Sequence, residues 1–331
     1  MNFVRFFSDV YADNGVRLQN RRRLARDLSL YGANRALRPL ERVLVARQTG
    51  PTPPIGFIVG APRSGTTLLM QLIARYLEVG YPSNFVARYW MAPLFGTMRF
   101  ERRFAAARSE IPLRSAFGGT DGPCSPHEFG WFWRFWAGTF ETDDLGDTEL
   151  DRFDWPTLRA EIHALASWLG RPYAFKSLNH VVYNIDRFAR EFPTSRFVYI
   201  RRDFRYVVQS ILECRIARYG TDRLWWTIRP RDVADWLDRS PIDQVCHQVA
   251  DIRRAIETSL SRLEPSRRLV LDYEDVVAAP REALTRVAEL LGAAAPAPRS
   301  ELERLALPSG NITRLDAATL AEIERKLEEK P

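Results

Sequence analysis

A run of small, hydroxyl-bearing and cationic residues stands between a short apolar segment and an apolar helical pattern. It spans residues 60–67, GAPRSGTT, with the glycine spacing of loops that bind phosphate. In such loops, backbone N–H groups and a helix N-terminus surround an anion. Thr66 occupies the position of the usual lysine, and the nearby cation is Arg63. The run predicts an anion site that works without a magnesium-centred triphosphate.

A second cationic group follows an apolar run at residues 196–200. Arg201 and Arg202 end this run, and Ser210 stands eight residues after Arg202. A guanidinium at the end of a strand and a hydroxyl in the following helix can converge on one phosphate. Arg202 and Arg201 are both candidate donors. Taken alone, these arginines and Arg205 have a solvated charge cluster as their alternative interpretation.

The distribution of lysines singles out one position. The chain has 45 arginines and only three lysines, Lys176, Lys326 and Lys330. Lys176 is therefore the only lysine in the first 325 residues. An arginine-rich background could leave one lysine by chance, or the position could need a compact ammonium in place of a planar guanidinium. We interpret Lys176 as a functional residue.

Residues 60–67 resemble the phosphosulfate-binding loop of sulfotransferases that use 3′-phosphoadenylyl sulfate (PAPS). The loop has an arginine at position 63, and in this it resembles the loops of the carbohydrate, tyrosylprotein and bacterial branches of that superfamily. The resemblance implies a P-loop-like α/β fold, PAPS as the sulfuryl donor and no metal cofactor. It also implies which groups hold the phosphosulfate: Arg63 and the backbone and hydroxyl groups of Ser64, Gly65, Thr66 and Thr67.

The segment around Arg202 resembles the second motif of this family, whose arginine and serine bind the 3′-phosphate of PAPS. This implies that role for Arg202 and Ser210, while Phe204 stands where the family usually has proline. Residues 175–178 resemble a segment that carries a lysine near the sulfonate, which implies that place for Lys176. The resemblance extends over roughly residues 55–315.

Two further likenesses lie toward the C-terminus. Residues 269–277, LVLDYEDVV, are similar to a family segment whose tyrosine lies near the nucleotide. Tyr273 is therefore a candidate nucleotide contact, with a core tyrosine as the alternative. Residues 309–314 stand where the family has a loop over the 3′-phosphate and adenosine, which implies Ser309 and Arg314 as contacts.

Sulfuryl transfer to an alcohol or amine needs a group that takes the proton of the acceptor. His127 and Glu128 offer an imidazole and a carboxylate after a turn-forming run. Branches of the family use either type, and Arg63 accompanies the glutamate branch, so we favour Glu128 with His127 as the alternative. The alternative explanation for Glu128 is structural: a carboxylate at a helix N-terminus interacts favourably with the helix dipole. Lys176 and Arg63 are expected to stabilise charge on the sulfonate and the leaving oxygen.

The stretch at residues 129–140 is rich in aromatic side chains. Helical spacing predicts a core-facing stripe made of Phe129, Phe132, Trp133, Trp136 and Phe140. Trp131 and Phe135 fall on another face, where they either line an acceptor pocket or pack against a further element.

The elements that must position these residues alternate between strands and helices. Strands are predicted at 55–59, 196–200 and 268–273, each followed by an apolar helical pattern. The alternation predicts an α/β fold with a central, mostly parallel sheet covered by helices on both faces. We expect a helical N-terminal extension over residues 1–50 and a single domain with a C-terminal loop and helix over 51–331.

Composition excludes several other classes. Hydrophobic residues make up 46% of the chain, too many for a disordered protein. Three widely spaced cysteines give no zinc or disulfide pattern, and no apolar run is long enough for a membrane span. These features favour a cytoplasmic protein. Because the arginines are interspersed with 41 acidic residues, a nucleic-acid partner is not expected.

The predicted activity is therefore PAPS-dependent transfer of a sulfuryl group to a hydroxyl, less favourably an amine, of a carbohydrate, lipid or secondary metabolite. The other product is adenosine 3′,5′-bisphosphate. One alternative is a P-loop kinase acting on a small molecule, against which Thr66 counts. Another is a non-catalytic protein that binds PAPS or a polyanion. The acceptor and the oligomeric state stay open at this stage.

Overall fold

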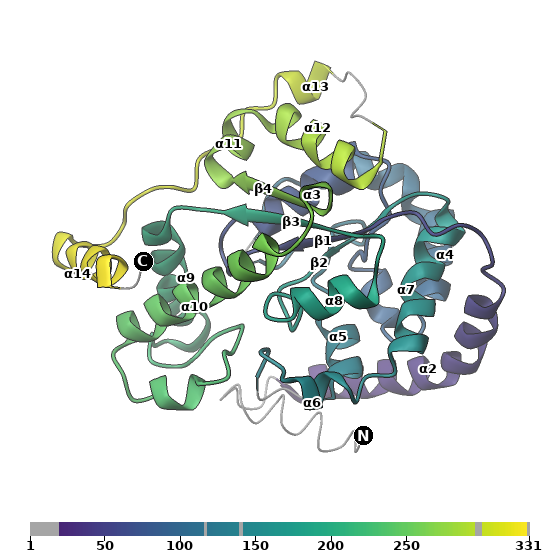
Figure 1. Ribbon diagram of the computed structural model, residues 1–331, viewed down its shortest axis with the longest axis horizontal. Helices are drawn as coiled ribbons and strands as arrows, with labels where there is room; N and C mark the ends of the chain where they lie inside the picture. Colours follow the sequence, from purple (N-terminus) through teal and green to yellow (C-terminus); the bar gives the residue numbers. More distant parts are fainter. Residues whose placement is uncertain (1–19, 116–117, 139–141, 295–299, 330–331) are drawn as a thin grey trace.

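A parallel sheet of four strands lies at the centre of the molecule (Figure 1). The computed structural model describes residues 20–115, 118–138, 142–294 and 300–329. The strand order is β2-β1-β3-β4, and all three neighbouring pairs are parallel. The strands are β1 (Ile55–Val59), β2 (Tyr173–Lys176), β3 (Ser195–Arg201) and β4 (Arg268–Asp272). The predicted α/β class with a parallel sheet is confirmed.

Helices pack on both faces of this sheet (Figure 1). The longer ones are α2 (Asn20–Ala46), α3 (Thr66–Tyr76), α4 (Pro93–Phe104), α5 (Gly130–Ala137), α7 (Trp155–Leu169), α9 (Phe204–Tyr219), α10 (Pro241–Ser261), α12 (Pro280–Leu291) and α14 (Ala317–Glu329). The shorter ones are α6 (Asp147–Leu150), α8 (Ile185–Glu191), α11 (Tyr273–Ala278) and α13 (Ser300–Glu303).

The predicted strands are found, with small boundary shifts and one strand missed; β3 extends one residue further at each end than predicted. β4 ends at Asp272, not at Tyr273, because Tyr273 is the first residue of α11. β2 was not predicted as a strand: its four residues, YAFK, are too few for a clear pattern, although all four are buried. The short β2 matters for function, because Lys176 is its last residue.

A row of phenylalanines crosses the sheet and anchors the core. Phe57 is in register with Phe175 on one side and Phe197 on the other, with ring centroids 5.9 and 5.3 Å away. Trp133 from α5 and Phe188 from α8 pack against Phe57 on this face, at 6.2 and 5.7 Å. Because these side chains are fully buried, truncating one ring to alanine is expected to cost about 3–5 kcal/mol.

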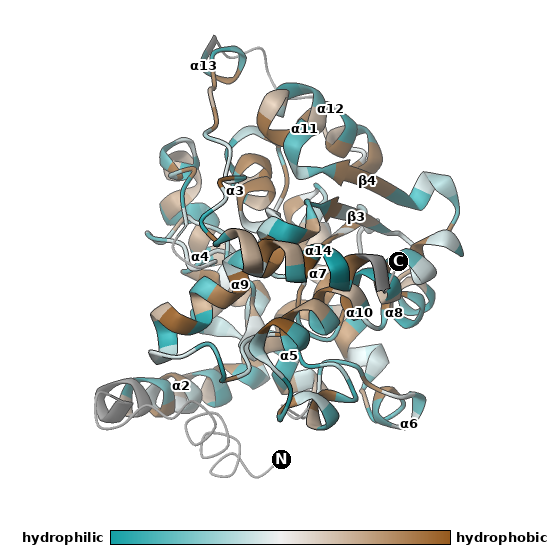
Figure 2. Cartoon of the chain, turned by 90° about the vertical axis from the view of Figure 1, so that its left-hand side faces the viewer, coloured by the Kyte–Doolittle hydropathy of each residue, from teal (hydrophilic) through white to brown (hydrophobic). Residues whose placement is uncertain are grey.

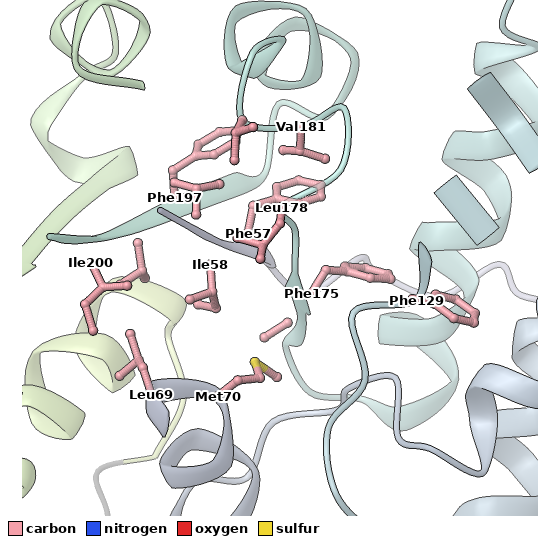
Figure 3. Close-up of a cluster of buried hydrophobic side chains, with 14 of the residues drawn as sticks. Phe57, Ile58, Leu69, Met70, Phe129, Phe175, Leu178, Val181, Phe197 and Ile200 are labelled. Carbon is pink, nitrogen blue, oxygen red and sulfur yellow. The ribbon is translucent and has the colours of Figure 1, made fainter. Parts of the chain in front are cut away.

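The opposite face of the sheet is covered by α3 and α12. Figure 3 shows Ile58, Leu69 and Met70 on this side, with Ile58 on β1 and the other two on α3. A Cβ at Gly56 would lie 2.9 Å from Leu291 of α12, so the absent side chain lets that helix approach β1 closely. The sheet is therefore buried on both faces, as parallel sheets generally are.

The N-terminal helix α2 packs across α4 and α7. Arg38 of α2 forms a buried ion pair with Glu161 of α7. Glu41 is fully buried and accepts hydrogen bonds from Leu94 N (2.7 Å) and Phe95 N (3.0 Å) in the first turn of α4. A carboxylate there stabilises the N-terminal end of a helix. The division of the chain at residue 50 stays a prediction.

The chain leaves α13 and returns across the carboxyl ends of the strands to reach α14. Gln209 of α9 donates to Ile312 O at 2.9 Å and so holds this returning segment. α14 lies against α9 and α10 (Figure 2), joined by the ion pairs Arg205–Glu324 (3.1 Å) and Lys326–Asp243 (2.5 Å). The C-terminal loop is thereby fixed beside the strand ends that carry the predicted site.

Candidate active site

A cavity of about 800 Å³ opens at the carboxyl ends of the strands. All four strand ends contribute to its wall: loop 60–67 after β1, Lys176 at the end of β2, Arg202 after β3 and Tyr273 after β4. Parallel sheets usually bind ligands where neighbouring strands lead to opposite faces. Here that point lies between β1 and β3, the strands that precede the two predicted anion-binding segments.

The two predicted anion-binding segments meet in this cavity. Arg63 Nε donates to Ser210 Oγ at 2.9 Å, and Arg202 Nη1 donates to the carbonyl oxygen of Arg63 at 2.9 Å. Gly65, with φ +102°, lets the loop turn directly into α3. The two segments, which are far apart in the sequence, are thus in direct contact. Their arginine side chains line the same cavity.

The two arginines at the end of β3 point to different places. Arg201 forms a two-bonded ion pair with Asp272, at 2.9 and 3.0 Å, in a solvent-exposed position. Arg202 is buried, lines the cavity, and donates to three neutral oxygens, on Arg63, Gly310 and Asn311. Burial and the neighbouring Arg63 charge lower the pKa of Arg202, against the opposing effect of Tyr273. An anion in the cavity would relieve this concentration of positive charge.

Lys176 and Glu128 form an ion pair on the cavity wall. Lys176 Nζ lies 2.6 Å from Glu128 Oε1 and donates to Thr67 Oγ1 at 2.6 Å. The lysine side chain is 2% exposed and that of Glu128 is 36% exposed. Although burial acts to raise it, the charge and hydrogen bond of Lys176 lower the pKa of Glu128. Gly118, with φ +84°, approaches so closely that a Cβ there would lie 3.7 Å from Glu128 Oε1.

His127 lines the same cavity with its ring held by the backbone. Its Nδ1 atom accepts a hydrogen bond from Phe129 N at 2.8 Å. Burial is the main cause that lowers the pKa of His127, opposed by the Glu128 charge, so the ring is neutral near pH 7. The structure brings both candidate bases to one wall, and the choice between them stays a prediction.

Most of the other predicted binding residues also reach the cavity. Tyr273 is both buried and on the wall: its ring lies 4.6 Å from the Arg202 guanidinium, and its hydroxyl accepts from Gly310 N at 2.9 Å. Arg314 lines the cavity while paired with Glu213 at 2.6 Å. Two predicted residues do not line it, namely Ser64, whose side chain is buried, and Ser309, whose hydroxyl accepts from Asn311 N.

Helix α5 serves both the core and the cavity. Phe132 and Trp133 are buried against the sheet, as the predicted stripe required, whereas Phe140 lies outside the described residues. Trp131 lines the cavity together with Arg134, one turn further along. Phe135 does not line it and packs instead under the guanidinium of Arg38, 5.4 Å from the ring centroid. Of the two residues considered for an acceptor pocket, Trp131 therefore lines the cavity and Phe135 does not.

Several wall residues were not singled out from the sequence. They come from the loop before α6, the segment after β2 and the loop after α9, and include Asp143, Asn179, His180, Trp226 and Arg229. The polar run that contains Asn179 and His180 would have been a signal only if β2 had been recognised as a strand. Asp143 and Arg229 had no such signal, because they become neighbours only in the fold, through hydrogen bonds from Arg229 N to Asp143 Oδ2 (2.9 Å) and from Asp143 N to Arg229 O (2.8 Å).

Within the described residues, no group of three or more His, Cys, Asp or Glu side chains could hold a metal ion. In the same part of the chain, none of the helices combines the length and apolar character that a membrane span requires.

A family comparison agrees with the fold and the cavity. Residues 54–296 match the model of the sulfotransferase family, and the chain therefore belongs to that family. It is an enzyme of the sulfotransferase class. None of the curated proteins matches the sequence at a significant level.

Three solved structures resemble the chain distantly. Sulfotransferase STF1 from Mycobacterium tuberculosis H37Rv is 14% identical, with 91% of this chain and 81% of that chain covered, at a TM-score of 0.49. Sulfotransferase STF9 from Mycobacterium avium is 16% identical, covering 85% and 69%, at 0.47. The sulfotransferase domain from the curacin biosynthetic pathway is 17% identical, covering 81% and 82%, at 0.44. At TM-scores below 0.5 these likenesses add no argument of their own.

Proposed function

We propose that the protein transfers the sulfuryl group of PAPS to a hydroxyl group of an acceptor that binds in the same cavity. The observation that carries the proposal is the convergence of Arg63, Arg202 and Ser210 beside the Lys176–Glu128 pair. A donor with a phosphosulfate and a separate 3′-phosphate needs cations at two places on one wall. Cations for the phosphosulfate are supplied by Arg63 and Lys176, and the cation for the 3′-phosphate is Arg202. The residues present therefore fit this donor.

Each of these residues has a distinct proposed role. Arg63 and the loop around Gly65 bind the phosphosulfate, and Arg202 with Ser210 binds the 3′-phosphate. Tyr273 and Arg314 line the remainder of the nucleotide part of the cavity. The C-terminal loop, to which Arg202 is bonded through Gly310 and Asn311, covers this part in the proposal. Positioned donors of this kind lower the barrier because they need not reorganise during the reaction.

Proton transfer and charge stabilisation fall to Glu128 and Lys176 in this proposal. As the acceptor oxygen forms its bond to sulfur, Glu128 accepts the hydroxyl proton, and the bond between sulfur and the leaving phosphate oxygen breaks. Lys176, held by Thr67 beside the loop, stabilises negative charge on the sulfonate and leaving oxygens. The products are the sulfated acceptor and adenosine 3′,5′-bisphosphate.

The direct test uses PAPS labelled with radioactive sulfur. The protein is incubated with this donor and fractionated acceptors, including carbohydrates, lipids and small metabolites, and labelled products are identified by mass spectrometry. The expected result is a labelled product with an equal amount of adenosine 3′,5′-bisphosphate. Tight PAPS binding without product in any fraction would favour a binding protein, and magnesium-dependent consumption of ATP would favour a kinase.

A further inference from the structure

A second polar group lines the cavity and has no role in the proposed transfer. It consists of Asp143, Asn179 and His180, which we call the His180 group. Asn179 and His180 follow β2, three and four residues after Lys176. The chain therefore leads directly from the transfer lysine to this group, within one continuous cavity.

The imidazole of His180 lacks a hydrogen-bond partner although it is buried. The residue is 2% exposed, and neither ring nitrogen is hydrogen-bonded within the described residues. Leaving a buried polar group unpaired costs on the order of 1–3 kcal/mol. His180 lines the cavity, but neither ring nitrogen is accessible from it in this structure, so a polar ligand can supply the missing partner only when the ring turns toward the cavity. A buried, unpaired imidazole at a cavity wall thus indicates a binding position.

Asp143 is placed to orient this ring. Its carboxylate accepts from Asn179 Nδ2 (3.3 Å), from His180 N (3.3 Å) and from Arg229 N (2.9 Å). His180 Nδ1 lies 3.7 Å from Asp143 Oδ1. A carboxylate beside Nδ1 favours the tautomer that carries its proton there, which leaves Nε2 as a hydrogen-bond acceptor. Burial lowers the pKa of His180 more than Asp143 raises it, and Arg134 lowers it further, so the ring stays neutral.

The backbone also sets His180 apart from an ordinary core histidine. Only four non-glycine residues in the described segments have positive φ: Arg63, Phe129, His180 and Thr227. Arg63, His180 and Thr227 line the cavity, and Phe129 stands between the wall residues Glu128 and Gly130. Such backbone strain costs roughly 1–3 kcal/mol per residue and concentrates at functional sites. His180 shares this property with residues of the proposed transfer site.

We propose that His180, oriented by Asp143, binds a second hydroxyl group of the acceptor, beside the hydroxyl that is sulfated. A neutral imidazole with a free acceptor nitrogen suits a hydroxyl donor and gives no attraction for an anion. The acceptor is therefore a compound with at least two hydroxyl groups on a ring or a chain, not a simple monohydric alcohol or phenol. Trp131 and Trp226 on the same wall offer flat apolar surface for its carbon skeleton.

This inference rests on the proposed function, because it presumes that another hydroxyl of the acceptor is sulfated. Binding of the acceptor can nevertheless be measured separately from sulfuryl transfer. The probes are cis-1,2-cyclohexanediol and cyclohexanol, which differ by one hydroxyl group. Binding is measured by quenching of tryptophan fluorescence, and turnover by release of adenosine 3′,5′-bisphosphate from PAPS. The wild-type protein is expected to bind the diol about tenfold more tightly than the monohydric probe, since an unpaired buried group gains its hydrogen bond.

Two variants test whether His180 causes this preference. His180→Phe keeps a ring but removes both nitrogens. His180→Asn can keep the backbone at positive φ, which asparagine tolerates, and its shorter side chain withdraws the polar atoms from the ligand. In both, diol binding is expected to fall about tenfold, to the level of cyclohexanol, whose own binding is unchanged. His163→Phe is the matched control, because His163 of α7 does not line the cavity.

Each outcome decides the matter. A wild-type protein that binds both probes equally, or fails to bind the diol, overturns the proposal, as does a preference that persists in His180→Phe and His180→Asn. Diol binding that depends on His180, but without release of adenosine 3′,5′-bisphosphate, leaves the His180 group standing and counts against the proposed sulfuryl transfer.

Discussion

Lys176 Nζ and Glu128 Oε1 are 2.6 Å apart in a largely buried ion pair at the edge of β2. The pair joins the residue proposed to stabilise the sulfonate to the residue proposed to accept the proton. Because the lysine is almost fully buried, removing either partner leaves the other charge poorly compensated. The two side chains are therefore expected to depend on each other, and double substitutions should be non-additive.

Lys176→Ala should lower kcat by about 10²–10³ while changing the KM for PAPS less, because its charge acts mainly on the transition state. Steady-state kinetics of product release measures both constants. The matched control is Lys326→Ala: this lysine of α14 pairs with Asp243 of α10 and does not line the cavity. Full turnover by Lys176→Ala at saturating PAPS would refute the catalytic role of the ammonium group.

Glu128→Gln should lower kcat by about 10²–10⁴, the range typical for loss of a general base. The pKa of Glu128 is held below its usual value by Lys176, against the effect of burial. Because a base works when unprotonated, the wild-type kcat/KM should stay level as the pH falls through the histidine range. The measurement is a pH profile of wild type, Glu128→Gln and His127→Asn.

The pH profile also separates the two candidate bases. Burial lowers the pKa of His127 from its ordinary value, so a histidine base would lose activity only on the acidic side of about pH 6.5. A loss of activity in that range, present in Glu128→Gln and absent in His127→Asn, would assign the proton transfer to the imidazole.

The sequence predicted the contiguous parts of this site better than its long-range contacts. Loop 60–67 is a short pattern whose glycine spacing indicates an anion site, and the pair Arg202 and Ser210 stands out through the family resemblance; both reach the cavity. The contact between Lys176 and Glu128 could not be predicted, because it joins residues 48 apart through the packing of α5 against β2.

Side-chain direction explains the remaining differences. Ser64 and Thr66 belong to one loop, yet only Thr66 lines the cavity, since the direction of each side chain depends on the turn that Arg63 and Gly65 make with positive φ. His180 stands two residues after the segment 175–178 that was noted for Lys176, but only the fold shows that its ring is buried and unpaired.

Arg202→Ala should weaken binding of adenosine 3′,5′-bisphosphate about 10- to 100-fold while affecting adenosine 5′-phosphate little, because charge-assisted hydrogen bonds are worth about 1.5–3 kcal/mol. Isothermal titration calorimetry with both nucleotides measures the discrimination. Arg201→Ala is the control, since that guanidinium is paired with Asp272 away from the cavity. Equal losses for the two nucleotides would show that Arg202 acts through the C-terminal loop and not on the 3′-phosphate.

Stability should fall as the pH rises from acid to neutral, because of the buried carboxylate between α2 and α4. Burial raises the pKa of Glu41 from 4.5 to about 7, although the hydrogen bonds from Phe95 N and Leu94 N oppose this. The folded state therefore binds a proton more tightly than the unfolded state, and its advantage is lost as the pH rises through the folded pKa. At about 1.4 kcal/mol per pKa unit, the loss amounts to about 3 kcal/mol.

Glu41→Gln should flatten this dependence, because the amide stays neutral, although its single oxygen can accept only one of the two hydrogen bonds from the first turn of α4. Urea unfolding of wild type and variant between about pH 4.5 and 7 measures the slope. Burial also raises the pKa of Glu161 to about 8, so part of the slope should remain in the single variant. Glu282→Gln, on the exposed side of α12, is the control. If Glu41→Gln keeps the wild-type slope, the buried carboxylate is ionised throughout and the assignment is wrong.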